Sequence, residues 1–346
     1  MTNRISIDNL QVAEELYNFV DQQVLPGTKL ASDTFWAGFA KLIADLSPKN
    51  NALLQKRTSL QQQINVYHQA HPADKFDFVD YKNFLSRIGY LAPVVEDFTI
   101  STNNVDAELA TMAGPQLVVP VMNARFALNA VNARWGSLYD ALYGSDVINE
   151  HDGAEKTKAY NPARGAKVIA FARDFLDQTI PLLAGSHREA KNYQIIDNAL
   201  VITLNNGEIA RLASPELFIG FSGQQTSPTE LVFKHHDLHF IIEFEQNNII
   251  AKSDNAGISD ISVESALTTI MDCEDSVAAV DAQDKVIAYQ NWLGLNQGTL
   301  SESFEKSGQQ QTRVMHQDKS FQKLDGSQGT LKARSLMFVR NVGHLM

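Results

Sequence analysis

Residues 267–276 read LTTIMDCEDS, a short apolar run that is followed at once by acidic residues. The same pattern occurs in residues 116–125 (QLVVPVMNAR) and in residues 336–346 (LMFVRNVGHLM), where the run opens onto an arginine and a glycine. Continuous apolar runs of this length suit strands buried on both faces, as in a parallel sheet covered by helices. In barrels of such strands the reactive groups gather at the carboxyl ends. The sequence therefore predicts an α/β fold with ionisable groups at one edge of a parallel sheet.

Composition limits the class of protein. With 346 residues, of which 44% are hydrophobic, the chain is long enough for two or three domains with their own cores. A formal net charge of −11 without a Lys/Arg run argues against nucleic acid and against an anionic membrane surface. The first thirty residues contain no apolar signal segment, and Cys273, the single cysteine, cannot form an internal disulfide. We therefore expect a cytoplasmic protein in which local arginines attract any anionic ligand.

The N-terminal part has helical patterns. Residues 1–90 are predicted to form a helical packing domain. Within it, Ser47 and Pro48 are typical of an N-cap and a first helical position, which predicts a new helix from there to about His68. Farther on, apolar residues at helical spacing predict one helix over residues 124–144.

The middle of the chain has a different pattern. Apolar runs at 200–204 and 209–212 flank Asn206-Gly207, a strong hairpin signal, and further runs at 230–234 and 238–244 indicate more strands. This predicts a mainly antiparallel module that is inserted between two strands of the parallel sheet. The polar stretch 300–332 is either a mobile excursion or part of that module.

Acidic and basic side chains follow the parallel strands. Asp272 and Glu274 could hold or orient the waters of a hard cation such as Mg²⁺. Alternatively, these acids cap a helix that begins over residues 276–281. Arg340 could bind a carboxylate or stabilise oxygen charge that grows during a reaction, or it could be a surface residue. His344 is a weaker candidate ligand and could equally be structural.

Other motifs are less informative. His235, Asp237 and His239 would share one face of a strand and could hold a metal, although alternate polar residues are also typical of a half-exposed strand. The chain has no phosphate loop, no dinucleotide-binding glycine motif and no Cys-x-x-Cys pair. Cys273 lies among acids that disfavour its thiolate, so we expect a small buried residue there.

Three long stretches resemble the malate synthase family, isoform G: residues 114–144, 271–294 and 334–346. The resemblance covers the N-terminal half of the family's chain. It implies an incomplete TIM barrel, of which only the first strands are present, with an N-terminal helical clasp and an inserted α/β domain. The implied domains are the clasp over 1–90, the partial barrel over 115–134, 263–297 and 334–346, and the inserted domain over 135–262 and 298–333.

The resemblance also implies a reaction, the Claisen condensation of acetyl-CoA with glyoxylate and water to give malate and CoA, with Mg²⁺ as cofactor. Arg340 falls on the family's catalytic arginine, which contacts glyoxylate. Asp272 and Glu274 resemble acids that hold metal-bound waters. Positions similar to those that line the family's acetyl-CoA site are Val118, Arg125, Phe126, Ser276 and Arg313.

One departure from the family matters. Family chains continue past this point, and their direct metal ligands and catalytic base would lie beyond Met346. We therefore expect the isolated chain to be inactive. Two alternatives stay open: a Mg²⁺-dependent lyase that acts on CoA thioesters, and a non-catalytic CoA-binding fragment that needs a second half. Members of the family are usually monomeric.

Overall fold

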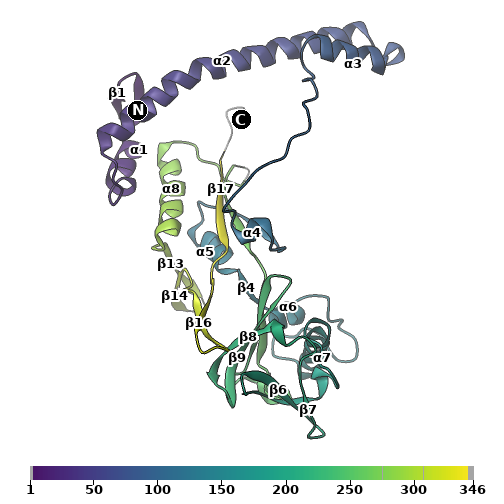
Figure 1. Cartoon of the computed structure of the whole chain (residues 1–346). Helices are drawn as coiled ribbons and strands as arrows, with labels where there is room; N and C mark the ends of the chain where they lie inside the picture. The colour runs from purple at the N-terminus through teal and green to yellow at the C-terminus, as the bar shows by residue number, and fades with distance from the viewer. Residues whose placement is uncertain (1–2, 275, 307, 342–346) are drawn as a thin grey trace. The chain divides into compact units, whose positions relative to one another are not determined.

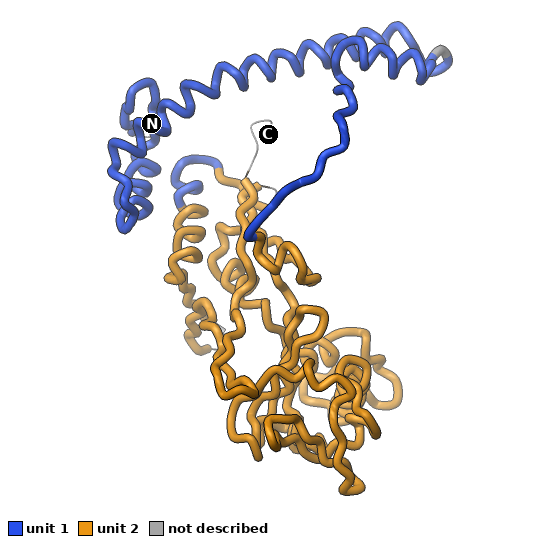
Figure 2. Tube along the Cα trace, in the orientation of Figure 1, with its two compact units in different colours: residues 1–104, 280–286 blue, residues 105–279, 287–346 orange. Residues whose placement is uncertain are grey.

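A computed structural model describes residues 3–274, 276–306 and 308–341. The chain divides into two compact units, residues 1–104 with 280–286 and residues 105–279 with 287–346 (Figure 2). Within the described residues, no helix is both long enough and apolar enough to cross a membrane.

The first unit is mainly helical, as predicted. A hairpin of β1 (Arg4–Ile7) and β2 (Leu10–Ala13) leads into α1 (Glu14–Phe19), and the long helix α2 (Ser32–Ala70) is followed by α3 (Phe78–Arg87). Aromatic rings pack against both ends of helix α2. Tyr17 stacks on Trp36 at one end, and Tyr67 stacks on Phe84 and donates to Asp80 at the other.

The predicted helix start at Ser47 and Pro48 is wrong. Helix α2 runs through both residues without a break (Figure 1). A proline inside a helix removes one main-chain hydrogen bond, a cost of about 3 kcal/mol. The many leucine, lysine, glutamine and alanine residues on either side favour the helix, and its packed ends hold it, so that cost does not end the helix here.

The second unit contains the predicted parallel sheet. Its three strands run in the order β17 (Leu336–Asn341), β12 (Thr268–Cys273), β3 (Gln116–Pro120), and both pairings are parallel. Two helices, α5 (Ala124–Asn132) and α8 (Ala282–Gln297), contribute apolar side chains to its core. That core contains Val119, Leu128, Val131, Met271 and Leu295.

An antiparallel part accompanies this sheet, as expected. A seven-stranded sheet has the order β16-β15-β8-β9-β10-β11-β4, and a three-stranded sheet has the order β5-β6-β7. Asn206 and Gly207 lie between β6 and β7, which confirms the predicted hairpin. The bounds are β4 Trp135–Ser137, α6 Leu138–Gly144, α7 Pro162–Thr179, β5 Ala190–Ile196, β6 Ala199–Leu204, β7 Ile209–Ala210, β8 Phe218–Gln224, β9 Ser227–His235, β10 Leu238–Glu243, β11 Asp260–Glu264, β13 Ser301–Lys306, β14 Gln309–Val314, β15 Lys319–Lys323 and β16 Gln328–Leu331.

Two sequence predictions in this unit need correction or refinement. The single helix predicted over residues 124–144 is divided into α5 and α6, because Trp135–Ser137 forms β4 and pairs with β11 instead. The polar stretch 300–332 forms two hairpins, and one of them joins the seven-stranded sheet through β15. The predicted domain boundaries and the incomplete barrel stay predictions.

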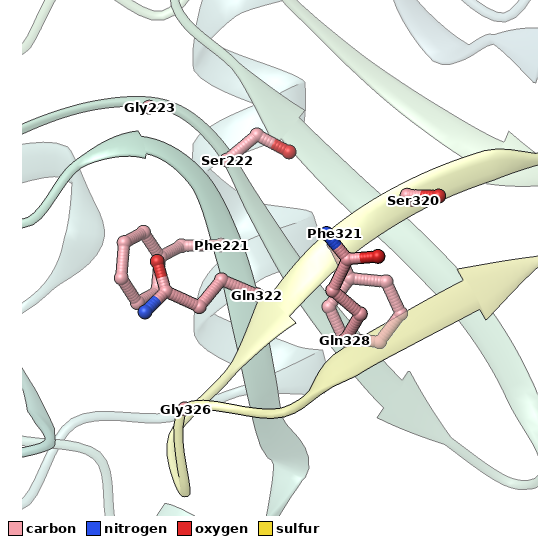
Figure 3. A pocket seen from close by; sticks show the side chains of 8 residues that line it. All are labelled: Phe221, Ser222, Gly223, Ser320, Phe321, Gln322, Gly326 and Gln328. Atoms are coloured by element: carbon pink, nitrogen blue, oxygen red, sulfur yellow. The ribbon is translucent and has the colours of Figure 1, made fainter.

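Two glycines fix the hairpin β15–β16 on β8. A Cβ atom at Gly220 would lie 2.6 Å from the Phe321 ring, and a Cβ atom at Gly329 would lie 2.3 Å from it. Both distances are too short for any residue other than glycine. The ring therefore packs directly on bare backbone. Beside it, Ser222, Gln322 and Gln328 line a small pocket between the strands (Figure 3).

A buried ionic network holds the segment that follows α5 to the seven-stranded sheet. Arg134, between α5 and β4, binds Glu264 of β11 and Glu108, and both carboxylates are almost fully buried. Lys332 also donates to Glu108, and His239 of β10 contacts Glu264. These ion pairs give the two buried carboxylates the partners that they need and so hold this segment against β10 and β11.

Candidate active site

The predicted site residues lie at the carboxyl edge of the parallel sheet. In the strand register, Asp272 of the central strand β12 is opposite Arg340 of β17 and Pro120 of β3. Residues paired across neighbouring strands point to the same face of a sheet. The helices cover the other face, which carries Val119 and Met271. The parallel pairing therefore brings an acid and an arginine together on the face that these helices leave uncovered.

Arg340 and the two acids form one charged cluster. The Arg340 Nε donates to Asp272 Oδ1 at 2.9 Å and lies 3.8 Å from Glu274 Oε2. The Asp272 side chain is fully buried, whereas Glu274 is 21% and Arg340 38% exposed. Arg340 is thus oriented by a buried carboxylate while part of its guanidinium faces outward.

Among the residues that the structure describes, four hydrogen-bond donors surround the Asp272 carboxylate. Besides Arg340 Nε, the backbone N–H of Glu274 donates to Oδ1, and the backbone N–H and hydroxyl of Ser276 donate to Oδ2. A carboxylate has about four lone-pair positions. The Arg340 guanidinium first, and then the Ser276 and Glu274 donors, hold the pKa of Asp272 well below its usual range. Asp272 is therefore ionised in the folded protein.

The alternative interpretation, in which the acids cap a helix, is not what the structure shows. The described residues among 276–281 form a turn and irregular backbone, and α8 starts only at Ala282. There Asp281 accepts a hydrogen bond from the backbone N–H of Asp284. Asp272 instead closes the turn after its own strand, because it accepts from the backbone of Glu274 and Ser276.

The residues predicted to contact acetyl-CoA fall into three places. Arg125 and Phe126 begin α5, where the Asn123 side chain accepts from the Phe126 N–H. The guanidinium of Arg125 lies over the Phe304 ring, and so does that of Arg313 from β14. Ser276 contacts Asp272, as described above, and the half-exposed Val118 lies in β3.

Phe304 was not predicted as a site residue. It lies in β13, and its role depends on how the hairpin β13–β14 folds beside α5. Phe304 is one of two phenylalanines in the polar stretch 300–332, and nothing in the sequence around it indicates that arrangement. Only the proximity of two arginines that are distant in sequence identifies it.

The remaining candidate ligands gain no support. Among the residues that the structure describes, no group of three or more His, Cys, Asp or Glu side chains could hold a metal ion by itself. His236 and Asp237 form a tight turn with positive φ, and His239 bonds to Glu264 instead of joining His235. Cys273 is buried, as expected, and His344 lies outside the described residues.

Comparison with known proteins connects this geometry to a family. The family described as "Malate synthase, N-terminal domain" matches residues 15–78, and "Malate synthase G, alpha-beta insertion domain" matches residues 160–235. Malate synthase G of Halalkalibacterium halodurans is 55% identical over 340 residues, which is 98% of this chain. The chain belongs to the malate synthase G family.

Two further malate synthase G relatives, from Corynebacterium efficiens and Corynebacterium glutamicum, are each 47% identical over 345 residues, which is 100% of this chain. The matched region makes up 47% of the Halalkalibacterium protein and 46% of each Corynebacterium protein. The chain thus spans about half the length of the curated relatives it matches. This membership confirms the resemblance that the three sequence stretches indicated.

Proposed function

We propose that this chain supplies part of the active site of a malate synthase, an acyltransferase that condenses acetyl-CoA with glyoxylate and water to give malate and CoA. One observation carries the proposal: adjacent parallel strands place Arg340 beside Asp272 and Glu274 at their carboxyl edge. Ligands of parallel α/β sheets bind at this edge. Membership of the malate synthase G family supports the same reaction.

We assign to Arg340 the stabilisation of the negative charge that develops on oxygen during the reaction. During the condensation the methyl group of acetyl-CoA loses a proton, and the thioester oxygen gains negative charge before the new C–C bond to the glyoxylate aldehyde carbon forms. A guanidinium that is already oriented stabilises such charge without reorganising. Asp272 supplies that orientation through the Nε, and the planar fork of the arginine also suits the glyoxylate carboxylate.

The acetyl-CoA side of the site is assigned to Val118, Arg125, Phe126, Ser276 and Arg313. Arg125 and Arg313 bring positive charge into a chain whose formal net charge is −11. Guanidinium groups bind phosphate oxygens in a bidentate manner, which suits the phosphates of CoA. The partly exposed rings of Phe126 and Phe304 add apolar surface beside them.

Mg²⁺ is the cofactor that the family implies, and the acids fit it unequally. Glu274 is partly exposed and its carboxylate can accept hydrogen bonds from metal-bound water. Asp272 already accepts from four donors, so we assign it mainly to the orientation of Arg340. Mg²⁺ held at Glu274 through its waters would supply a positive charge that polarises the carbonyl oxygen of glyoxylate.

We also propose that the parallel strands belong to a TIM barrel. Val118, Ile270 and Phe338 lie side by side in the strand register. Each lies two residues before the row that contains Asp272 and Arg340, and therefore on the same face of the sheet. Val118 is 54% exposed, and the other two are only partly buried. In a closed barrel this face points inward and its apolar side chains pack in layers. Further strands would cover these residues.

A chimera tests the proposed function. The matched region of the Halalkalibacterium relative is replaced by this chain, and CoA release from acetyl-CoA is measured with and without glyoxylate and Mg²⁺. We expect release that needs both additions. A chimera that folds cooperatively and releases no CoA contradicts the proposal.

The chimera and the isolated chain together separate the alternatives. As a lyase, the chimera would cleave malyl-CoA without consuming glyoxylate. As a non-catalytic fragment that needs a second half, the isolated chain would retain CoA without any turnover. The expectation that the isolated chain is inactive stays a prediction, and CoA release by this chain alone, at the rate of the chimera, would contradict it.

A further inference from the structure

A single aromatic ring lies next to both arginines of the proposed acetyl-CoA site. The Cζ atoms of Arg125 and Arg313 are 5.2 and 5.5 Å from the centroid of the Phe304 ring. Both distances are within the range of cation–π attraction, in which a guanidinium lies over the negative face of a ring. Arg125 also lies 5.6 Å from the Phe126 ring.

The three residues come from different elements that are fixed to one another. Arg125 belongs to α5, Phe304 to β13 and Arg313 to β14. The buried Asn132, in the last turn of α5, donates to the Val314 carbonyl and accepts from the N–H of His316. The hairpin is therefore held against α5, so the position of Phe304 does not depend on the arginines alone.

Neither arginine has an ion-pair partner among the residues described. Glu302 is opposite Arg313 in the hairpin register, yet the structure shows no ion pair between them. Arg125 likewise makes no ion pair with a described acid. Two guanidinium groups repel each other, and without carboxylates the aromatic face is the attractive contact that the structure shows for both. An anion that accepts hydrogen bonds from both guanidinium groups would offset this repulsion.

We propose that Phe304 is a positioning residue that holds Arg125 and Arg313 as a pair for the phosphate groups of the CoA ligand. This inference rests on the proposed function for the identity of the ligand. The inference gives Phe304 a role, although Phe304 is not among the residues that the family resemblance implied for the acetyl-CoA site. The ring fixes the direction of two long side chains, which reduces the conformational entropy that they lose when an anion binds.

Variants of the full chain at Phe304 test the inference. Phe304→Leu removes the ring face and keeps apolar bulk, whereas Phe304→Tyr keeps the ring. Phe171→Leu, at a partly exposed phenylalanine of α7, is the matched control. Two ligands, CoA and inorganic pyrophosphate, are titrated calorimetrically. In parallel, the Nε–Hε resonances of Arg125 and Arg313 are followed by NMR after assignment through Arg→Lys substitutions.

We expect Phe304→Leu to shift both arginine resonances through loss of the ring current, and to weaken CoA binding about tenfold, the combined effect of two such contacts. Phe304→Tyr and the control should retain both properties. Unchanged resonances or unchanged affinity in Phe304→Leu overturns the inference. If the chain binds pyrophosphate in a Phe304-dependent way but not CoA, the inference stands and the proposed ligand is wrong. If neither anion binds, the inference is overturned.

Discussion

Substitution of Asp272 by asparagine is expected to destabilise the second unit. The carboxylate is fully buried and accepts from Arg340, Glu274 and Ser276. An amide of the same shape carries no charge, and its NH₂ group must face at least one of these donors. Loss of one partner from a buried ion pair costs about 3–5 kcal/mol. Because Arg340 is 38% exposed and can be solvated, we expect a loss of about 2–3 kcal/mol here.

The pH dependence of this effect has a defined sign. The pKa of Asp272 is lowered on folding, mainly by the hydrogen bond from Arg340, so its ionisation stabilises the folded state above the unfolded value of 3.8. That contribution is fully present at pH 7 and is lost as the pH falls through the lowered folded value. The difference in unfolding free energy between wild type and Asp272→Asn should therefore shrink on acidification below about pH 4.

Urea unfolding at pH 7 and at pH 3 measures this difference. The matched control is Asp325→Asn, since Asp325 also accepts from the backbone and hydroxyl of a serine, Ser327, but lies exposed in a turn. The control should cost no more than about 0.5 kcal/mol, as is usual for surface substitutions. Equal stabilities of wild type and Asp272→Asn at pH 7, or a difference that stays constant down to pH 3, would refute the reasoning.

Two further predictions concern the antiparallel part of the second unit. Arg164 is fully buried, and within the part of the chain that the structure describes its side chain donates only to backbone carbonyls. Arg164→Met should therefore lower the unfolding free energy by about 3–5 kcal/mol, whereas Arg188→Met, at an exposed ion pair, should cost less than about 1 kcal/mol. Equal midpoints in thermal unfolding would contradict this. Gly329→Ala should lower the unfolding free energy by about 1–3 kcal/mol, because the new methyl group would collide with the Phe321 ring. Gly144→Ala is the control, since a methyl group there meets no neighbour and should not destabilise the protein. Equal effects of the two substitutions in urea unfolding would disprove the packing argument.

The sequence was most informative where apolar runs end in charged residues. The runs that became β3, β12 and β17 were recognisable because strands buried by helices need continuous apolar residues, and parallel pairing then brought Asp272 and Arg340 together. Their mutual orientation was not predictable, because it depends on the turn that Asp272 closes with Ser276.

Local signals failed where distant contacts decided the structure. Pro48 is tolerated in the middle of α2, which is packed at both ends. Trp135 lies in strand β4 and not in the predicted helix, because its backbone pairs with β11. Phe304 was overlooked because its importance comes from two arginines in other elements. In each case tertiary packing outweighed local preference.

The central claim is that the Arg340 of this chain serves the condensation of acetyl-CoA with glyoxylate. It is tested most directly by CoA release from the chimera with the Halalkalibacterium relative, compared between the wild-type residue and Arg340→Gln at saturating substrates. Removal of one group that stabilises developing oxygen charge should lower kcat by about 10²–10³-fold, with the affinity for acetyl-CoA little changed. An Arg340→Gln chimera that turns over at the wild-type rate would contradict the account.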